Sequence, residues 1–251
     1  MMERDHERMI AARLEANRIP FHSELPWKLA VYLRLLRAWN EKMDLTAVEG
    51  EADLLDRHFT DSLTVLRTGL VTGAPTLIDV GTGAGFPGMV LAMALPEARV
   101  TLLDSQQKRL SFLETVRTET GTRNVTLVHV RAEDGARQPE LREQFDLACA
   151  RAVAPLNVLC ELLLPYVRVG GRMLCWKGPG LAEEMESGRR AAFLLGGRTE
   201  EPLACPVEGR DWDHRILPVL KTGATPRKYP RKAGVPKRDP LAGALPQRCK
   251  E

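Results

Sequence analysis

From residue 76 onward, short apolar segments alternate with amphipathic helical ones, and this alternation restricts the fold more than any other feature of the chain. The strand-like segments are residues 76–81, 99–104, 125–130, 145–150 and 172–177. The helical segments between and after them are residues 86–94, 106–120, 155–167 and 181–195. Such alternation predicts an α/β fold with a parallel, doubly wound, Rossmann-like sheet. Two more strand-like segments, near 198–206 and 213–220, bring the predicted sheet to seven strands.

The segments on either side of this region have different patterns. Apolar residues between Leu25 and Trp39, and again between Leu55 and Leu66, recur at helical spacing, so we predict an N-terminal helical extension over residues 1–70. The α/β domain then covers residues 71–221. Residues 222–251 contain five prolines and many charges, which predicts an extended, mobile tail.

Composition limits the class of protein. The longest apolar runs, such as residues 89–95, are far shorter than the roughly 20 residues that a membrane helix needs, and the charged N-terminus has no secretory signal. We therefore expect a cytoplasmic protein without a membrane partner. The five cysteines are widely spaced and form no C-x-x-C pair, so we expect neither a metal site nor a disulfide framework. Cys149 and Cys175 lie in apolar runs and are expected to be buried. We also expect a monomer.

A glycine-rich turn follows the first predicted strand: residues 81–85 read Gly-Thr-Gly-Ala-Gly. Glycines between a strand and a helix allow a nucleotide-like ligand to approach the backbone and its free N–H groups. We expect Gly81 and Gly83 to contact such a ligand. Residues 83–88 also match the dinucleotide pattern G-x-G-x-x-G, so the glycines alone leave a dinucleotide and S-adenosylmethionine both open.

Acidic residues near the strand ends favour one of these two ligands. Asp79 precedes the first glycine by two residues, where a carboxylate would repel a pyrophosphate but attract the ammonium and sulfonium groups of S-adenosylmethionine. Asp104 ends the second predicted strand, where an acid can accept both ribose hydroxyls, although it could instead cap the next helix. Ala132 and Glu133 follow the third strand, where these folds surround the adenine. These residues predict a site for the methyl donor.

Several motifs resemble those of the ribosomal RNA small subunit methyltransferase G family, also called GidB. In the α/β region they are residues 77–88, 102–105, 108–109, 151–152 and 177–178. Upstream and downstream they are residues 39–47 (WNEKMDLTA), 57–63 (RHFTDSL), 229–234 (YPRKAG) and 236–237. The likeness thus runs from about residue 39 to 241. Asp44 stands where the family more often has Asn.

The resemblance implies S-adenosylmethionine-dependent methylation of a guanine at N7 in 16S ribosomal RNA, with the free RNA or the small ribosomal subunit as partner. It implies cofactor contacts at Gly81, Phe86, Asp104, Ser105, Gln106, Ala132, Glu133 and Arg151. N7 has a lone pair and no proton, so the reaction needs no general base, and we assign no catalytic residue. A methyltransferase that acts on a protein or small molecule stays open as the alternative.

Polar residues elsewhere are candidates for substrate contacts. Arg151 and Lys177 end the fourth and fifth predicted strands, at the sheet edge where ligands bind; Arg151 would contact cofactor or substrate, unless it forms only a surface ion pair, and Lys177 would contact a phosphate or guanine O6. His58, Asp61 and Ser62 suggest a catalytic triad, but on one helix such neighbours bond locally. We therefore favour helix packing for these three residues.

The tail is the basic part of the chain. Residues 221–238 contain seven Lys and Arg residues and no acid, whereas the rest of the chain has 29 basic and 33 acidic residues. We expect the tail to contact RNA phosphates, unless its charges are merely solvated, with Tyr229 stacking on a base. The candidate phosphate ligands are Arg227, Lys228, Arg231, Lys232, Lys237 and Arg238.

Overall fold

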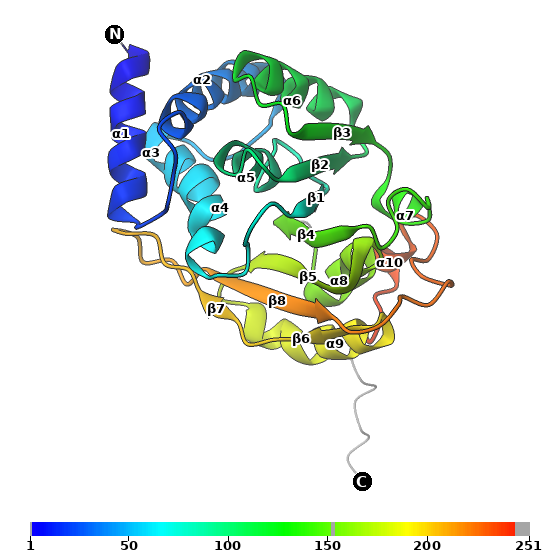
Figure 1. The fold of residues 1–251 in the computed structure, drawn as a ribbon. Helices are drawn as coiled ribbons and strands as arrows, with labels where there is room; N and C mark the ends of the chain where they lie inside the picture. Colours follow the sequence, from blue (N-terminus) through cyan, green and yellow to red (C-terminus); the bar gives the residue numbers. More distant parts are fainter. Residues whose placement is uncertain (1, 152–153, 244–251) are drawn as a thin grey trace.

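The computed structural model describes residues 2–151 and 154–243, and they are built around one twisted sheet (Figure 1). Its strands are β1 (Thr76–Val80), β2 (Arg99–Asp104), β3 (Val125–His129), β4 (Phe145–Arg151), β5 (Val167–Lys177), β6 (Gly197–Thr199), β7 (Leu203–Ala204) and β8 (Arg215–Lys221). They follow the order β3-β2-β1-β4-β5-β8-β6, with β7 also paired to β8. The predicted Rossmann-like α/β fold is confirmed.

The sheet differs from the prediction at one edge. Strands β1 to β5 are parallel, but β8 runs antiparallel to β5, and β6 and β7 run antiparallel to β8. The described sheet has eight strands rather than seven, because the segment expected as one strand near 198–206 forms two short strands, β6 and β7, that pair with different parts of β8. This edge lies below β5 in Figure 1.

Helices cover both faces of the sheet. They are α5 (Gly88–Ala94), α6 (Gln107–Glu119), α7 (Ala132–Gly135), α8 (Leu156–Leu163), a 3₁₀ turn (Leu164–Tyr166) and α9 (Leu181–Leu194). Alternate residues of each strand enter opposite cores, as the two-residue period requires: Cys149 packs in the core beneath α5 and α6, and Cys175 in the core beneath α8 and α9. Both thiols are buried, as predicted. No described helix is long and apolar enough to cross a membrane.

The N-terminal region is helical, as predicted, and belongs to the first of these cores. Its elements are α1 (Met2–Ala16), α2 (Leu25–Met43), α3 (Glu51–Leu54), a π-helical turn η1 (Leu55–Thr60), α4 (Asp61–Leu63) and a 3₁₀ turn (Thr64–Arg67). Tyr32 and Phe59 are fully buried in the same core as Phe112 of α6. The ring of Tyr32 lies 6.0 Å from that of Phe112, so the extension covers one face of the sheet.

Residues 222–243 fold back onto the body of the protein beside α7 and α8 (Figure 1). Arg142 donates hydrogen bonds to the carbonyls of Thr225 (2.8 Å) and Tyr229 (3.0 Å), and a short helix, α10 (Val235–Arg238), follows. The prediction of an extended tail is therefore wrong here, because its backbone carbonyls and one arginine are bound by side chains of the α/β domain. Residues 244–251 lie outside the described residues.

Candidate active site

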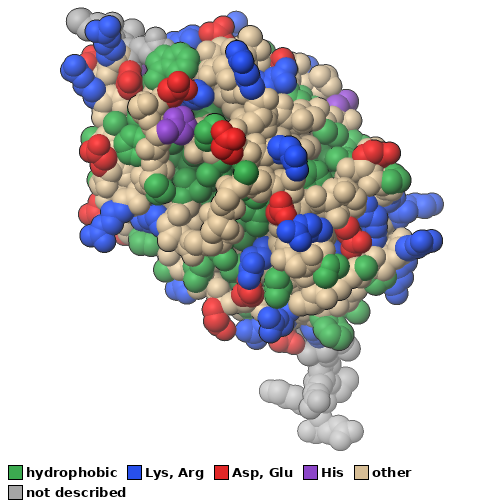
Figure 2. All heavy atoms as spheres, viewed as in Figure 1, with side chains coloured by type: hydrophobic (Ala, Val, Ile, Leu, Met, Phe, Trp, Pro, Cys, Tyr) green, Lys and Arg blue, Asp and Glu red, His purple; other side chains and the backbone are tan. Residues whose placement is uncertain are grey.

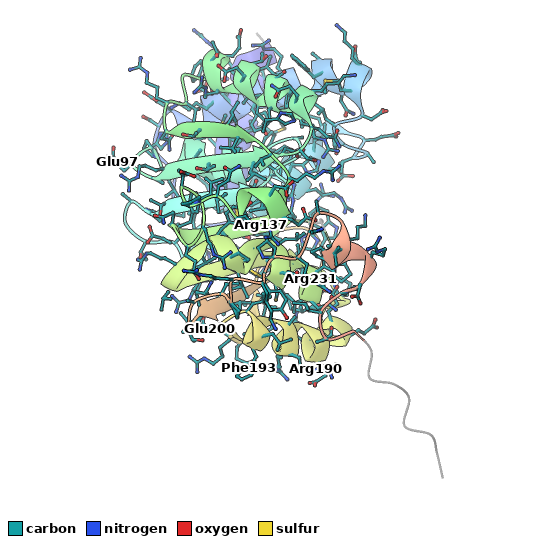
Figure 3. All side chains as sticks on the ribbon, turned by 90° about the vertical axis from the view of Figure 1, so that its right-hand side faces the viewer. Glu97, Arg137, Arg190, Phe193, Glu200 and Arg231 are labelled. Atoms are coloured by element: carbon teal, nitrogen blue, oxygen red, sulfur yellow. The ribbon has the colours of Figure 1, made fainter. Side chains whose placement is uncertain are left out.

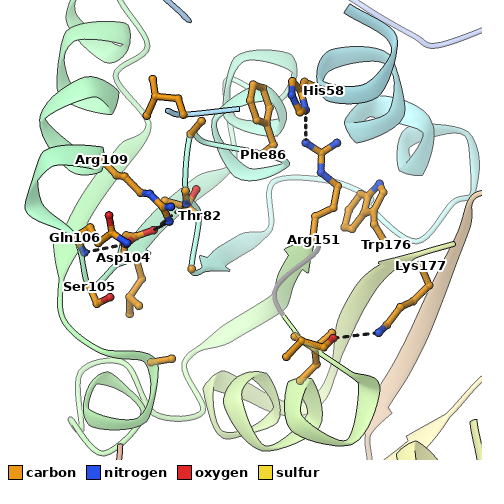
Figure 4. A pocket seen from close by; sticks show the side chains of 18 of the residues that line it. His58, Thr82, Phe86, Asp104, Ser105, Gln106, Arg109, Arg151, Trp176 and Lys177 are labelled. Carbon is orange, nitrogen blue, oxygen red and sulfur yellow. Dashed lines mark hydrogen bonds and ion pairs between the residues drawn. The ribbon is translucent and has the colours of Figure 1, made fainter. Parts of the chain in front are cut away.

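A cavity of about 1010 Å³ opens at the carboxyl ends of the central parallel strands. Figure 4 shows Asp104, Ser105 and Gln106 on one side of this cavity and Arg151, Trp176 and Lys177 on the other. The predicted site residues that line it are Gly81, Gly83, Phe86, Asp104, Ser105, Gln106, Ala132, Glu133, Arg151 and Lys177. Thus one cavity brings together residues from five segments of the α/β domain, which is the arrangement that a doubly wound sheet provides.

The glycine-rich turn forms one wall of the cavity. Gly81, Gly83 and Gly85 have φ angles of 72°, 59° and 97°, values that residues other than glycine rarely adopt. A Cβ at Gly85 would overlap the Tyr32 hydroxyl and lie 2.7 Å from Leu113 Cδ2, whereas at Gly83 the nearest atoms are 3.9 Å away. Gly85 thus permits close packing of the extension, and Gly83 leaves space in which a ligand can approach the backbone.

Asp79 lies beneath this turn and is not among the residues that line the cavity, so its contact with the cofactor stays a prediction. Its side chain is fully buried, and Oδ2 accepts hydrogen bonds from the Thr82 hydroxyl (2.7 Å) and the Gly88 N–H (2.9 Å). Burial raises the pKa of Asp79 to about 6, although these two hydrogen bonds oppose the shift. Asp79 therefore holds the turn and the start of α5 in place. Because it does not line the cavity, its charge can act on a ligand there only across the intervening protein atoms.

Asp104 lies on the cavity wall, where both of its predicted roles are compatible (Figure 4). Its Oδ1 accepts from the N–H of Gln106 at 2.8 Å, at the start of α6, and its Oδ2 accepts from the N–H of Gly83 at 2.9 Å. Arg109 Nη1 lies 3.6 Å from Oδ2. Each carboxylate oxygen can accept a second hydrogen bond, so Asp104 can hold the turn against α6 and still meet a hydroxyl pair in the cavity.

The predicted adenine segment connects the cavity with the C-terminal segment. Ala132 and Glu133 begin α7, and the Tyr166 hydroxyl donates to the Ala132 carbonyl at 2.6 Å. Glu133 Oε1 accepts a hydrogen bond from the N–H of Gly234 at 2.7 Å. A pocket-lining carboxylate is therefore held directly by the segment that the sequence predicted to be mobile.

Arg151 is held by residues of the N-terminal extension, so it is not a simple surface ion pair. Its Nη1 donates to the Arg57 carbonyl and to Asp61 Oδ2 (3.2 Å), and its Nη2 lies 2.9 Å from His58 Nδ1. On the same side of the cavity, Lys177 Nζ donates to Glu184 (2.6 Å) and to the Ala154 carbonyl (3.2 Å). Both cations keep part of their donor capacity for a ligand.

His58, Asp61 and Ser62 do not form a triad: the Ser62 hydroxyl donates to the backbone carbonyl of His58. The packing interpretation nevertheless missed that His58 and Asp61 line the cavity. Asp61 Oδ1 lies 2.8 Å from His214 Nδ1, and the Trp176 indole donates to the Asp61 carbonyl at 3.1 Å. No sequence pattern joined these residues. The 57–63 motif was the one available signal for His58 and Asp61.

The basic residues of the C-terminal segment lie outside the cavity lining. Arg227, Lys228, Lys232, Lys237 and Arg238 are exposed, and Figure 2 shows Lys and Arg side chains projecting from the right-hand edge, where Figure 1 places this segment. Two predictions are corrected here. Tyr229 is buried and cannot stack on a base, and Arg231, labelled in Figure 3, bonds the fully buried Glu161 and also Asp239, which fixes it within the protein.

The fold and cavity together define a Rossmann-like α/β protein with a ligand cavity at the carboxyl ends of its parallel strands. Solved structures with this fold include a mutant of MtNAS in complex with S-adenosylmethionine (TM-score 0.52, 15% identity, 87% of this chain and 98% of that one). Another is the putative transferase PH0793 from Pyrococcus horikoshii (TM-score 0.51, 15% identity, 64% of each chain). At this level of identity the likeness shows the fold alone.

Sequence comparison gives the particular family. The model of rRNA small subunit methyltransferase G matches residues 27–210. Curated proteins called ribosomal RNA small subunit methyltransferase G are 47% identical in Alkaliphilus oremlandii (85% of this chain, 90% of the relative) and 42% identical in Clostridium perfringens strain 13 (88% and 92%). The chain belongs to the rRNA small subunit methyltransferase G family, which confirms the resemblance found in the sequence.

Proposed function

We propose that this protein transfers the methyl group of S-adenosylmethionine to N7 of a guanine in 16S ribosomal RNA. The observation that carries the proposal is the single cavity in which the glycine turn and Asp104 face Arg151 and Lys177. The glycine turn, Asp104 and Arg151 suit a nucleoside with an amino-acid group, and Lys177 suits an anionic or carbonyl-bearing substrate. The relatives are named for ribosomal RNA methylation, which supports RNA over the alternative of a protein or small molecule.

The residues present fit the methyl donor. The open space at Gly83 and the unused acceptor sites of Asp104 suit a ribose that lies against the backbone, and a guanidinium such as that of Arg151 suits a carboxylate. When bound, S-adenosylmethionine supplies the activated methyl group. We assign its binding to Gly81, Gly83, Phe86, Asp104, Ser105, Gln106, Ala132, Glu133 and Arg151, with Asp79 acting indirectly through the turn.

The contacts of the carboxylates in the cavity support an N7 acceptor. Each described carboxylate in the lining is already bound: Asp61 by Arg151 and His214, Asp104 by backbone N–H groups, Glu133 by Gly234 and Glu184 by Lys177. Such groups are poor general bases, and N7 requires none. Alignment of the nucleophile with the methyl group can supply roughly 7–11 kcal/mol when the geometry is favourable, so the residues of the cavity would act by orientation.

The exposed basic residues of the C-terminal segment support an RNA substrate. Arg227, Lys228, Lys232 and Lys237 can neutralise phosphates on the outer surface, while Lys177 can reach a phosphate or guanine O6 within the cavity. We further propose that the enzyme acts as a monomer, and an RNA substrate of this kind is consistent with a cytoplasmic enzyme.

The test uses the full-length protein with methyl-labelled S-adenosylmethionine and unmodified small ribosomal subunits or free 16S RNA. We expect label in the RNA. We also expect borohydride reduction followed by aniline to cleave the RNA at one guanine, because N7 methylation makes that base reducible and its bond to the ribose labile. Label without cleavage would rule out N7. Label absent from both RNA substrates would overturn the RNA assignment and favour the protein or small-molecule alternative.

A further inference from the structure

Two nitrogens of Arg151 are fixed by different partners. Nη1 is bound by the Arg57 carbonyl and Asp61, and Nη2 is bound by His58 Nδ1 at 2.9 Å, as Figure 4 shows. A guanidinium has five N–H donors, so these three contacts leave two donors for a ligand. Because a guanidinium is planar, fixing both terminal nitrogens also fixes the direction of the remaining donors.

The contact with Arg151 determines the form of the His58 ring. A guanidinium can only donate, so Nδ1 must be the acceptor and the ring must be neutral, with its proton on Nε2. Nε2 lies 2.7 Å from the Thr46 hydroxyl oxygen, which can accept a hydrogen bond from Nε2–H and which also accepts one from the Val48 N–H at 3.1 Å. The segment that carries Thr46 is in turn held by Asn40 through two hydrogen bonds. Both ring nitrogens of His58 therefore have defined roles.

The plane of the His58 ring is fixed as well. It stacks on Phe86 with centroids 4.5 Å apart and an interplanar angle of 10°. Phe86 stacks in the same way on Tyr32 at 5.4 Å, and the Tyr32 hydroxyl donates to the Ala84 carbonyl in the glycine turn. The imidazole is thus fixed by stacking on one face and by hydrogen bonds at both nitrogens, which is more than helix packing alone requires.

We propose that His58 is a positioning residue, whose neutral imidazole fixes Nη2 of Arg151 so that the remaining guanidinium donors face the ligand in the cavity. This inference rests on the proposed function, because it takes Arg151 as a contact of the methyl donor. A protonated ring would lose its acceptor and place a second positive charge against Arg151. Burial, together with Arg151 and Arg57, lowers the pKa of His58 to about 3 despite the opposing influence of Asp61, so the ring stays neutral at physiological pH.

Two substitutions separate positioning from packing. His58→Asn places an amide oxygen where Nδ1 lies and keeps the acceptor for Arg151, but it loses the stacked ring. His58→Phe keeps the ring on Phe86 and loses the acceptor. The readout is the affinity for S-adenosylmethionine by titration calorimetry. We expect the Phe variant to bind about tenfold more weakly than the wild type, the effect of one lost hydrogen bond to a charged group, and the Asn variant to stay within about threefold.

The opposite ranking, with Phe near wild type and Asn weak, would overturn the inference in favour of packing, and equal affinities for all three proteins would also overturn it. If His58→Phe does not fold, His58→Ala and Arg151→Ala are compared in a double-mutant cycle. His58→Ala should weaken binding in the wild-type background and have no further effect in the Arg151→Ala background; additive losses would contradict the proposal. A wild-type protein that binds no S-adenosylmethionine would instead refute the proposed function.

Discussion

The N-terminal extension lines the cavity, and the C-terminal segment (residues 222–243) contacts the lining residue Glu133, but different forces hold the two. The extension is fixed by apolar packing: Leu29, Tyr32 and Phe59 are fully buried in one core with the helices of the α/β domain. The C-terminal segment buries Tyr229 in the second core, but it is held mainly by charged side chains. Arg231 bonds the fully buried Glu161 at 2.7 Å, and the buried Lys221 at its base lies 3.0 Å from Glu143.

This difference has consequences for function. Apolar packing has no directional requirement, so the extension can remain in place while its polar residues, His58 and Asp61, serve the cavity. Removing one partner of an ion pair with a buried carboxylate strongly reduces the stability of the protein, because the remaining charge is left buried. The position of the C-terminal segment should therefore be the more sensitive of the two to a single substitution. The hydrogen bond from the Gly234 N–H to Glu133 connects this segment to the cofactor side of the cavity.

The largest effect should come from removing the charge that holds the C-terminal segment. Arg231→Ala removes the guanidinium from the buried Glu161 carboxylate and leaves it only the backbone N–H of residue 231, which should reduce the free energy of unfolding by about 3–5 kcal/mol. Urea denaturation measures this. Arg227→Ala, at an exposed position of the same segment, is the matched control and should change stability by less than about 0.5 kcal/mol. A loss below about 1 kcal/mol in Arg231→Ala would show that charge does not hold this segment.

Acid should act mainly on the extension. The pKa of His58 is about 3 in the folded protein against an ordinary value of 6.5, so between these values the unfolded chain binds the proton first and stability falls as pH falls. From about pH 7 to about pH 4.5 the wild type should lose roughly 2–3 kcal/mol more than His58→Phe. Urea denaturation at a series of pH values gives both curves.

The comparison between the two curves removes other titrating groups that they share. Asp79, whose pKa is raised to about 6 from 3.8, acts in the opposite direction, because its protonation between these values favours the folded state. That contribution should be the same in both proteins. Parallel curves for the wild type and His58→Phe would mean that His58 protonates as readily in the folded chain as in the unfolded one.

The contact between the extension and the glycine turn can be tested with two neighbouring glycines. Gly85→Ala would overlap the Tyr32 hydroxyl and lie close to Leu113, whereas Gly83→Ala meets no atom nearer than 3.9 Å. Both have positive φ, which costs an alanine about 1 kcal/mol, so Gly85→Ala should be less stable than Gly83→Ala by about 2 kcal/mol. Thermal unfolding measures the difference. Equal stabilities would mean that Tyr32 does not pack tightly against the turn.

The sequence predicted the parts of this protein that depend on neighbours in the chain. The glycine turn and the position of Asp104 follow from local strand and turn patterns. The buried position of Asp79 could not be predicted, because a sequence does not show that its Oδ2 accepts from the N–H of Gly88, nine residues away. The network of His58, Asp61, Arg151 and His214 joins residues up to 153 positions apart, and no local pattern indicates such a contact.

The C-terminal segment was misjudged for a related reason. Its composition is typical of a segment whose charged side chains are solvated. Arg231, however, forms an ion pair inside the protein with Glu161, which lies 70 residues earlier in the chain. The sequence did identify the exposed basic residues of this segment, and what it could not show is that the backbone carrying them is held against α7 and α8. The predicted contacts with RNA therefore concern a fixed surface rather than a free tail.

The smallest effect should come from the exposed charges on this surface. Lys232→Ala and Lys237→Ala remove no described ion pair, so stability should change by less than about 0.5 kcal/mol. If each lysine contacts one phosphate, each substitution should weaken RNA binding several-fold and reduce the slope of log affinity against log salt by about 0.7–0.9. Arg198→Ala, at an exposed position on β6, is the control. Unchanged slopes in both lysine variants would separate the C-terminal segment from RNA binding, leaving the extension and the α/β domain to hold the substrate.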